Sequence, residues 1–394
     1  MKILILSPRF PYPETGGDIV RINKVAYYLK SQGHEVILLT FYQNESQLNV
    51  ERPAFDKIYS VRHSKAEAML YMPWAVLKGM PLQSGYYYSP RFKKKLKEVL
   101  QAEKPDRIVA WLLRTTPYID EMGLESETIV EMSDALSKTY TMTGKGKGSI
   151  VKKTAYAIER YLIGNYDESV ITRYPKVILV AKQDIEFLHQ NTKGDSSSLA
   201  FHTLGMDYLS ERPAAADIDY NKICFVGHMS TLQNQDAVIR FVEEIFPKIL
   251  AKNPNAKFYI VGADPSAKIK ALASDHIIVT GFVDSIEDTI KDSCVAVAPV
   301  YVAAGLQNKV LFAMGCGVPV VMSSLIAKAI PEIRDGENCH VCNDADSFAE
   351  SVLALMNDKQ HRMQIGTAGY DVIREHYSWN ERLKGYEDFD ANKI

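Results

Sequence analysis

Continuous apolar runs alternate with amphipathic segments from one end of this 394-residue chain to the other. The first half contains KILILS, EVILLTF, RIVAWLL, TIVEM and KVILVA, and the second half contains ICFVG, KFYIVG, HIIVTG, CVAVAPV and VPVVMS. Because these runs are unbroken and rich in leucine or β-branched residues, they are typical of parallel strands buried on both faces. Segments with helical spacing, such as DAVIRFVEEIFPKILAKNP, lie between them. This alternation predicts doubly wound α/β sheets.

The alternation starts again after residues 202–222, which are rich in Ala, Pro and Asp and show no clear period. A chain of this length can form two separate cores. We expect a first Rossmann-like domain over residues 1–205 and a second over residues 206–375. Residues 376–394 are predicted to form a helix that packs back on the first domain. Open α/β sheets bind ligands at the carboxyl ends of their strands, so the two domains are expected to face a ligand cleft.

Charge and composition exclude several other classes of protein. A formal net charge of -2 argues against a nucleic-acid binder, and no apolar stretch reaches membrane-spanning length. The start, MKILILSPRFPYP, is typical of a first strand and not of a signal peptide. Cys339 and Cys342 have CxxC spacing, but no second pair completes a zinc site, so a metal or redox role is disfavoured. Five scattered cysteines favour a reducing, cytoplasmic compartment.

The loop after the first strand contains two adjacent glycines, Gly16 and Gly17, in PRFPYPETGGDIVR. Glycine permits positive φ and a close approach of the backbone to a ligand. The helix expected from Asp18 would direct free N–H groups toward an anion. A simple strand-to-helix turn with Asp18 as N-cap fits the same residues equally well.

Asp134 follows the apolar run TIVEM and is placed by it at the carboxyl edge of the first sheet. At that edge its carboxylate is a candidate general base or ligand of a sugar hydroxyl. Helix capping is the alternative, and for an isolated aspartate it is the commoner role.

Gly227 ends the first strand of the second domain in FVGHMSTLQNQDAVIRF. Backbone amides near His228 are placed to face a phosphate at the start of the following helix. His228 itself fits a polar loop residue as well as a ligand contact.

A second helix start, in GLQNKVLFAMGCGVPVV, is the best candidate for an anion site. Its first turn contains Gly305, Leu306, Gln307, Asn308 and Lys309. Helix dipole and a full positive charge would act on one ligand there, which makes Lys309 the leading candidate for a diphosphate contact. An exposed helix lysine is the alternative.

Taken together, these elements resemble family-four glycosyltransferases of GT-B architecture, over nearly the whole chain. The segments that carry the resemblance are YPETGGDIVR, FVGHM with QNQDAV, KFYIVG, VTGFVDS, GLQNKVLFAMGCGVPVV, IRDGENCHV and the terminal YSW. GGDIVR and GLQNKVL look most like an exopolysaccharide-associated branch of that family.

The resemblance implies a nucleotide sugar held mainly by the second domain and an acceptor held mainly by the first. Asp134 falls near the family's polar active-site residue. The positions that match donor-site motifs are Gly16, Gly17, Phe282, Val283, Gln307, Asn308 and Lys309. Phe282 and Val283 match the loop that usually frames the nucleobase.

Two glutamates of the family, eight positions apart, would fall on Ala304 and Phe312, and neither is a carboxylate here. The apolar run that contains Leu311, Phe312 and Met314 favours a core position for Phe312. A non-catalytic nucleotide-sugar or glycan-binding protein is therefore the alternative function. A hydrolysing epimerase would need further carboxylates and histidines that the sequence does not reveal.

We therefore expect a glycosyltransferase that moves a sugar from a UDP- or GDP-linked donor to a surface-polysaccharide or polyprenyl-linked glycan. Retention of anomeric configuration is implied by the resemblance. No cofactor or metal is expected, because helix dipole and Lys309 would neutralise the diphosphate.

Residues 69–97 combine Trp74 and Tyr86–Tyr88 with the basic cluster Arg91, Lys93, Lys94, Lys95 and Lys97, and residues 144–153 form a second basic segment. Aromatic rings beside lysines suit the interface of an anionic membrane. We therefore expect docking on the inner face of the plasma membrane. A solvated lysine face beside a covered aromatic patch is the alternative.

Overall fold

The computed structural model describes residues 1–14, 17–49, 53–143, 150–211, 217–301 and 307–389. The chain divides into two compact units. The N-terminal unit comprises Met1–Leu204 together with Arg382–Ile394, and the C-terminal unit comprises Gly205–Glu381. The residues after Arg382 therefore belong to the unit with which the chain begins.

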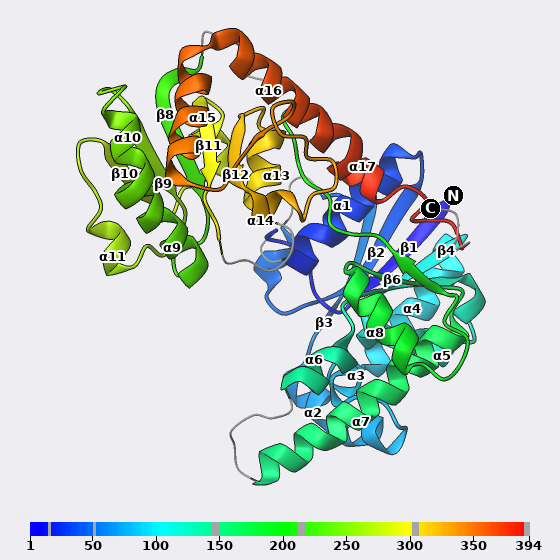
Figure 1. Cartoon of the computed structure of the whole chain (residues 1–394). Helices are drawn as coiled ribbons and strands as arrows, with labels where there is room; N and C mark the ends of the chain where they lie inside the picture. The colour runs from blue at the N-terminus through cyan, green and yellow to red at the C-terminus, as the bar shows by residue number, and fades with distance from the viewer. Residues whose placement is uncertain (15–16, 50–52, 144–149, 212–216, 302–306, 390–394) are drawn as a thin grey trace. The chain divides into compact units, whose positions relative to one another are not determined.

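The N-terminal unit is built on a parallel sheet of seven described strands, in the order β3-β2-β1-β4-β5-β6-β7 (Figure 1). The strands are β1 (Lys2–Ser7), β2 (Glu35–Tyr42), β3 (Lys57–Arg62), β4 (Arg107–Trp111), β5 (Thr128–Ser133), β6 (Lys176–Leu179) and β7 (Leu199–Phe201). Leu4 of β1 lies beside Ile37 of β2 and Ile108 of β4, and all three side chains are buried. Burial on both faces is why these runs are continuously apolar.

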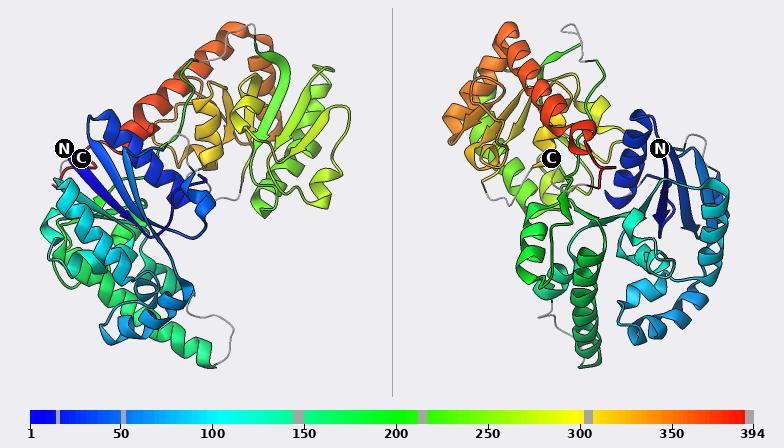
Figure 2. Two further views of the ribbon diagram at one scale, coloured as in Figure 1. Left: turned by 180° about the vertical axis from the view of Figure 1, so that it is seen from behind. Right: turned by 90° about the vertical axis from the view of Figure 1, so that its right-hand side faces the viewer.

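Helices cover both faces of this sheet. They are α1 (Gly17–Ser31), α2 (Lys65–Leu77), α3 (Leu82–Tyr86), α4 (Pro90–Glu103), α5 (Thr116–Asp120), α6 (Leu136–Thr143), α7 (Ile150–Arg173) and α8 (Lys182–Asn191). Figures 1 and 2 show α2, α3, α6 and the first half of α7 gathered at one end of the unit.

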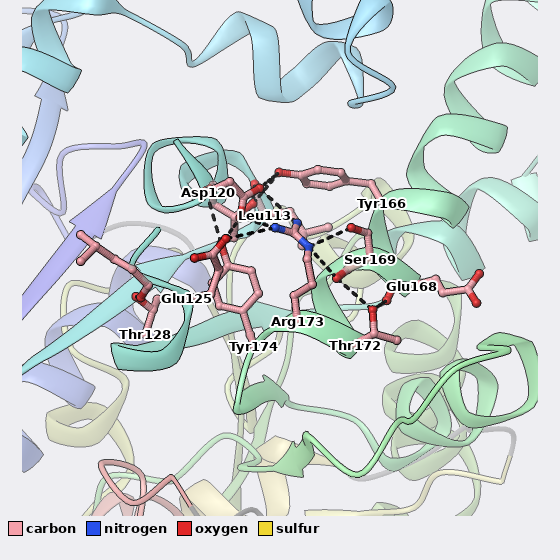
Figure 3. A network of polar contacts seen from close by, with 12 residues as sticks. Leu113, Asp120, Glu125, Thr128, Tyr166, Glu168, Ser169, Thr172, Arg173 and Tyr174 are labelled. Atoms are coloured by element: carbon pink, nitrogen blue, oxygen red, sulfur yellow. Dashed lines mark hydrogen bonds and ion pairs between the residues drawn. The ribbon is translucent and has the colours of Figure 1, made fainter. Parts of the chain in front are cut away.

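The carboxyl end of α7 is fixed to α5 by a polar network (Figure 3). Arg173 donates from Nη1 to Oδ1 of Asp120 at 2.8 Å and from Nη2 to Oδ2 at 3.1 Å. Tyr174 donates to the same Oδ1 at 2.5 Å. A paired guanidinium–carboxylate contact of this kind fixes geometry as well as charge, so it holds the carboxyl end of α7, just before β6, against α5.

The C-terminal unit has a second parallel sheet of six described strands, in the order β10-β9-β8-β11-β12-β13. They are β8 (Asp219–Val226), β9 (Lys257–Val261), β10 (Ile277–Gly281), β11 (Ser293–Ala298), β12 (Val320–Ser323) and β13 (His340–Cys342). Its helices are α9 (Leu232–Arg240), α10 (Phe246–Leu250), α11 (Ala267–Lys270), α12 (Ile286–Ile290), α13 (Asn308–Gly315), α14 (Ser324–Ala327), α15 (Ala345–Asn357), α16 (Lys359–Val372) and α17 (Trp379–Arg382). Short π-helical turns continue α9 and α16.

All ten runs that the sequence predicts as strands form strands, five in each unit. The described strands that it misses are β3, β7 and β13, at sheet edges. The CxxC segment spans β13, and both of its thiols are buried. Among the described residues, no helix is long and apolar enough to cross a membrane.

The expected helix over residues 376–394 is wrong in form. α17 ends at Arg382, and turns follow from Leu383. Individual side chains anchor this segment, so it does not need the apolar face of a helix. Leu383 and Tyr386 are fully buried. Lys176 at the start of β6 donates to the carbonyl oxygen of Gly385 at 2.7 Å.

Candidate functional site

The two central strands of the C-terminal sheet, β8 and β11, are neighbours, and the strand order reverses between them. β9 and β10 extend the sheet on one side, and β12 and β13 extend it on the other. A crevice forms outside the carboxyl ends of strands at such a switch point, and it is the usual ligand site of open α/β sheets. The loops that follow β8 and β11 lead into α9 and α13, so Gly227, His228 and Lys309 lie at this edge.

Lys309 lies in the first turn of α13, where no acidic side chain is present. Its Nζ donates to Oδ1 of Asn234 and lies 4.8 Å from the centroid of the Phe225 ring. Burial lowers the pKa of this half-buried lysine to about 8. No carboxylate of the described chain lies within ion-pair distance of it. A cation with only neutral partners at a helix amino terminus is well placed to receive an anion.

Asn234, in α9, joins this lysine to the loop after β8. Its Nδ2 donates to the carbonyl oxygen of His228 at 2.9 Å while its Oδ1 accepts from Lys309. A Cβ on Gly227 would lie 2.6 Å from Asn234 Nδ2, so glycine is required there. His228 is exposed, and its Nε2 lies 3.3 Å from Oδ2 of Asp264. The sequence reasoning missed Asn234, although it lies one helical turn after the loop that contains Gly227.

The other residues predicted at the helix start divide into described and undescribed positions. Gln307 is the N-cap of α13, and its Oε1 accepts from Nε2 of Gln233 at 3.2 Å. Asn308 is exposed. Gly305 and Leu306, like Ala304, lie outside the described residues, as does Gly16.

Phe282 and Val283 follow β10, at the edge of the sheet and two strands from β8. Phe282 is 77% exposed, whereas Val283 packs partly against the core. An aromatic ring left this open to solvent at a carboxyl edge suits stacking on a base, and the nucleobase role stays a prediction.

Phe312 is half-buried and packs against the core of the C-terminal unit. The apolar run that contains it predicts this position.

In the N-terminal unit, Asp134 follows Ser133, whose φ of 64° is in the left-handed region. A positive φ at a serine is uncommon and turns the chain sharply at the end of β5. Asp134 is exposed, and partial removal from water, together with the charge of Asp184, raises its pKa. Asp184 accepts the N–H of Ala135 at 3.0 Å, so the start of α6 does not depend on the Asp134 side chain. Its assignment as a catalytic group stays a prediction.

Gly17 begins α1 and is exposed, and Asp18 in the first turn pairs with Arg9 at 3.3 Å. Arg9 follows β1, and Arg114 follows β4, the neighbouring strand. The sequence reasoning missed both arginines. A charged residue a few positions after a buried strand was the available signal.

A buried network lies behind this edge. Glu131 of β5 accepts from Arg21 Nη2 at 3.0 Å, from Tyr386 at 3.1 Å and from Ser133 at 3.0 Å. Arg21 also donates to the carbonyl oxygen of His202 at 2.8 Å. A buried ion pair is costly unless further hydrogen bonds satisfy its atoms. Here they satisfy most of them, and Arg21 Nε is left without a partner among the described residues. It joins α1, β5 and the C-terminal segment.

The basic-aromatic segment is largely engaged within the N-terminal unit. Tyr88 is buried and stacks on Tyr118 at 5.3 Å, and Trp74 lies 4.4 Å from Tyr88. Lys93 pairs with Glu121 at 2.6 Å, and Arg91 with Glu67. These rings belong to the covered patch that was the alternative interpretation. The basic segment at 144–149 lies outside the described residues.

Comparison with known proteins gives a consistent result. Residues 220–358 match the family model described as Glycosyl transferases group 1. The chain is 20% identical over 390 residues to an uncharacterised 44.6 kDa protein in the cps region of Klebsiella pneumoniae, covering 95% of this chain and 96% of that protein. Anabaena HepE in complex with UDP has a similar structure, with a TM-score of 0.60, 14% identity and coverage of 98% of this chain and 99% of HepE. WaaG, a glycosyltransferase involved in lipopolysaccharide biosynthesis, gives a TM-score of 0.53 at 14% identity, with the same coverage.

Proposed function

We propose that this protein is a glycosyltransferase that uses a nucleoside-diphosphate sugar as donor. Its chain has the GT-B fold and matches the glycosyl transferases group 1 model over residues 220–358. The observation that carries this proposal is Lys309 at the start of α13, half-buried and held by neutral Asn234 at the switch point of the second sheet. Solved structures of the similar protein HepE contain UDP, UDP with glucose, and UDP-glucose. UDP is therefore the first nucleotide to test.

The diphosphate is proposed to lie against the amino terminus of α13, near Lys309 and the backbone that follows Gly227. The helix dipole and the ammonium group neutralise negative charge as it develops on the leaving nucleotide. No divalent metal is required in this scheme. Asp134 is proposed to act on the acceptor hydroxyl, since its raised pKa makes its carboxylate a better base than an ordinary aspartate.

The acceptor is proposed to be a surface-polysaccharide or lipid-linked glycan. Support comes from the relative encoded in a cps region and from WaaG, whose described role is in lipopolysaccharide biosynthesis. Retention of configuration belongs to the same proposal by analogy.

The direct experiment is calorimetric titration of the full chain with UDP in the presence of EDTA. We expect binding without metal, and a rise in melting temperature with UDP concentration, because a ligand of the native state stabilises it by mass action. Binding that appears only with Mg²⁺ or Mn²⁺ would contradict the metal-independent scheme.

Phe312 favours one second candidate, a binding protein without transferase activity, because the position lacks the carboxylate that family members use. Incubation with a panel of nucleotide sugars separates the two functions. A transferase releases UDP or GDP from one of them, at least slowly to water, whereas a binding protein leaves every donor intact.

We infer that membrane contact, which belongs to the acceptor proposal, is made by α2 and not by the aromatic rings. Met69, Leu70 and Leu77 of α2 are 68%, 76% and 87% exposed. Lys94, one turn after the Arg91 that pairs with α2, is exposed as well. Apolar side chains beside lysines suit the surface of an anionic bilayer.

Liposome flotation checks this inference. Leu70→Glu with Leu77→Glu is expected to abolish flotation on anionic vesicles, and Lys94→Glu to weaken it in a salt-dependent way. Glu98→Gln, at an exposed position of α4, is the matched control. Equal flotation of the double variant and the wild type would rule out α2.

A further inference from the structure

Two arginines lie at the carboxyl edge of the N-terminal sheet, and both contact Tyr87. Arg9 follows β1 and Arg114 follows β4, and these strands are neighbours at the switch point of that sheet. The Arg114 guanidinium carbon lies 5.3 Å from the centroid of the Tyr87 ring. Contact with Tyr87, and then the charge of Asp18, raises the pKa of Arg9. The N-terminal unit therefore places two guanidinium groups where an open sheet binds ligands, and Arg9 is the one that also pairs with Asp18.

Arg114 is held without a negative partner. Its Nε donates to Oε1 of Gln83 at 2.9 Å, and its other described contact is the Tyr87 ring. Burial, and then the charge of Arg9, lowers its pKa. A guanidinium nevertheless remains charged in proteins. No carboxylate of the described residues is within ion-pair distance of Arg114. Partly removing a charge from water costs free energy, and an arriving anion offsets that cost.

A cavity of about 160 Å³ adjoins Arg9 at the same edge. It is lined by Phe41 and Gln43 from the end of β2 and the loop after it, and by His63 directly after β3. The His63 ring centroid lies 5.4 Å from that of Tyr87, which contacts both arginines, so the cavity lies next to the arginine pair. Its volume corresponds to about five water molecules, which leaves room for a phosphate group or part of a sugar ring.

We propose that Arg9 and Arg114 bind an anionic group of the acceptor, a phosphate or a carboxylate carried close to the hydroxyl that is glycosylated. The guanidinium fork matches the geometry of either oxyanion. Gln43, which lines the cavity, offers hydrogen bonds to the adjoining sugar. This inference rests on the proposed function, and it specifies an acidic acceptor where that function left the acceptor open. The donor diphosphate is assigned elsewhere, to Lys309 in the C-terminal unit.

The test uses the full chain and three small probes. Methyl glucuronide supplies a carboxylate beside a sugar ring, glycerol 3-phosphate supplies a phosphate, and methyl glucoside is the uncharged control. Titration followed by NMR is expected to show binding of one anionic probe but not of methyl glucoside, and the probe that binds identifies the acidic group. Arg114→Gln and Arg9→Gln should each weaken that binding about 10-fold or more, because each removes a charge-assisted contact.

Arg160→Gln is the matched control, since Arg160 is an exposed arginine of α7 that does not line this cavity, and it should leave binding unchanged. Arg114→Lys keeps the charge but loses the fork, so an intermediate affinity is expected. Arg9 is exposed, so Arg9→Gln is expected to fold. It therefore tests the inference even if Arg114→Gln does not fold.

Two results would overturn the inference. The first is that both anionic probes fail to bind, or bind the folded arginine variants as tightly as wild type. The second is that Arg9→Gln lowers the affinity for UDP as strongly as a change at Lys309 does, which would assign the arginines to the donor. UDP titration of the wild type is read separately, so a failure of the proposed function is distinguished from a failure of the acidic-acceptor site.

Discussion

Lys309 and Arg114 share one physical condition. Each is a half-buried cation whose described partners are neutral, and burial lowers the pKa of each. A buried charge that has no role in substrate binding is normally paired with an opposite charge or lies at the surface. Otherwise the cost of removing it from water is not compensated. Perturbed cations at sheet edges are therefore good candidates for substrate contacts.

Replacing Lys309 by alanine tests the donor site. Loss of a charge-assisted contact of about 1.5–3 kcal/mol is expected to weaken UDP binding by about 10- to 150-fold. Calorimetric titration measures it. Uridine lacks the diphosphate and should bind the variant and the wild type equally. Unchanged UDP affinity in a folded variant would remove Lys309 from the donor site.

The depressed pKa of Lys309 adds a pH dependence to the same measurement. Because its pKa is about 8 in the free protein, the side chain loses its charge above that pH. UDP affinity of the wild type is therefore expected to fall between pH 7 and pH 9.5, while that of Lys309→Ala stays flat over the range. An equal fall in both proteins would assign the effect to another group.

Two buried groups of the N-terminal unit are expected to have opposing effects on acid stability. Burial raises the pKa of Asp167 to about 6, so its ionisation destabilises the unit as pH rises from about 4 through 6. Burial, and then the charge of Lys176, lowers the pKa of His202 to about 4, so stability is lost as pH falls below about 6.5. Each effect is on the order of 3 kcal/mol, and in the wild type they largely cancel.

Asp167→Asn should remove the effect of Asp167 ionisation and leave that of His202. The amide keeps an acceptor for the N–H of Ser137, which Asp167 accepts at 3.2 Å, but it does not titrate. The variant should be more stable than wild type at pH 7 and lose stability steeply between pH 6.5 and pH 4.5. Urea unfolding followed by tryptophan fluorescence measures this. A variant with the flat pH profile expected of wild type would contradict the assignment.

At the scale of elements, the segment after α17 acts as a tie along the amino ends of the first sheet. Glu387 approaches His34 before β2 at 3.8 Å, Phe389 lies under Arg107 at 4.2 Å, and Gly385 accepts from Lys176 of β6. Tyr386 reaches furthest inward, to Glu131. The functional edge lies at the other ends of the same strands, so the tie leaves it open.

Tyr386→Phe removes only the hydroxyl from that tie. A hydrogen bond to a buried carboxylate contributes about 1.5–3 kcal/mol, and we expect a loss of that size in the free energy of unfolding of the N-terminal unit. Trp74 and Trp111 belong to this unit and report its unfolding by fluorescence. Tyr161→Phe, at a tyrosine that is 69% exposed, should change stability by less than about 0.5 kcal/mol. Equal stability of both variants would show that the hydroxyl contributes nothing.

The sequence predicts the central strands because burial on both faces leaves an uninterrupted apolar run. β3 and β13 lie at edges, where polar residues such as Lys57 and His340 interrupt the pattern, and β7 has only three residues. The C-terminal tie was predicted to return to the first domain, but its form was not. Isolated buried residues such as Leu383 and Tyr386 are too few to establish a helical period. The sequence pattern therefore cannot distinguish a turn from a helix in this segment.

For the whole molecule, resemblance and pattern together predict the GT-B fold and the start of α13 as the anion site. Asn234, Arg9 and Arg114 escaped prediction because each derives its importance from a partner far along the chain. Asn234 matters through Lys309, and Arg114 matters because no carboxylate of the described residues forms an ion pair with it. Distance in three dimensions, and the lack of a counter-charge, cannot be read from local spacing.

The tie also fixes an order of events during synthesis. The N-terminal unit opens the chain but is completed by residues after Arg382, so the ribosome must first make the whole C-terminal unit. That intervening stretch of roughly 180 residues takes about 9–36 s to translate at 5–20 residues per second. During this interval Glu131 and Arg21 lack Tyr386, while the contiguous C-terminal unit already has all its strands. The nascent chain is therefore expected to complete its second unit before its first, and to leave the N-terminal unit protease-sensitive until its C-terminal segment has been made.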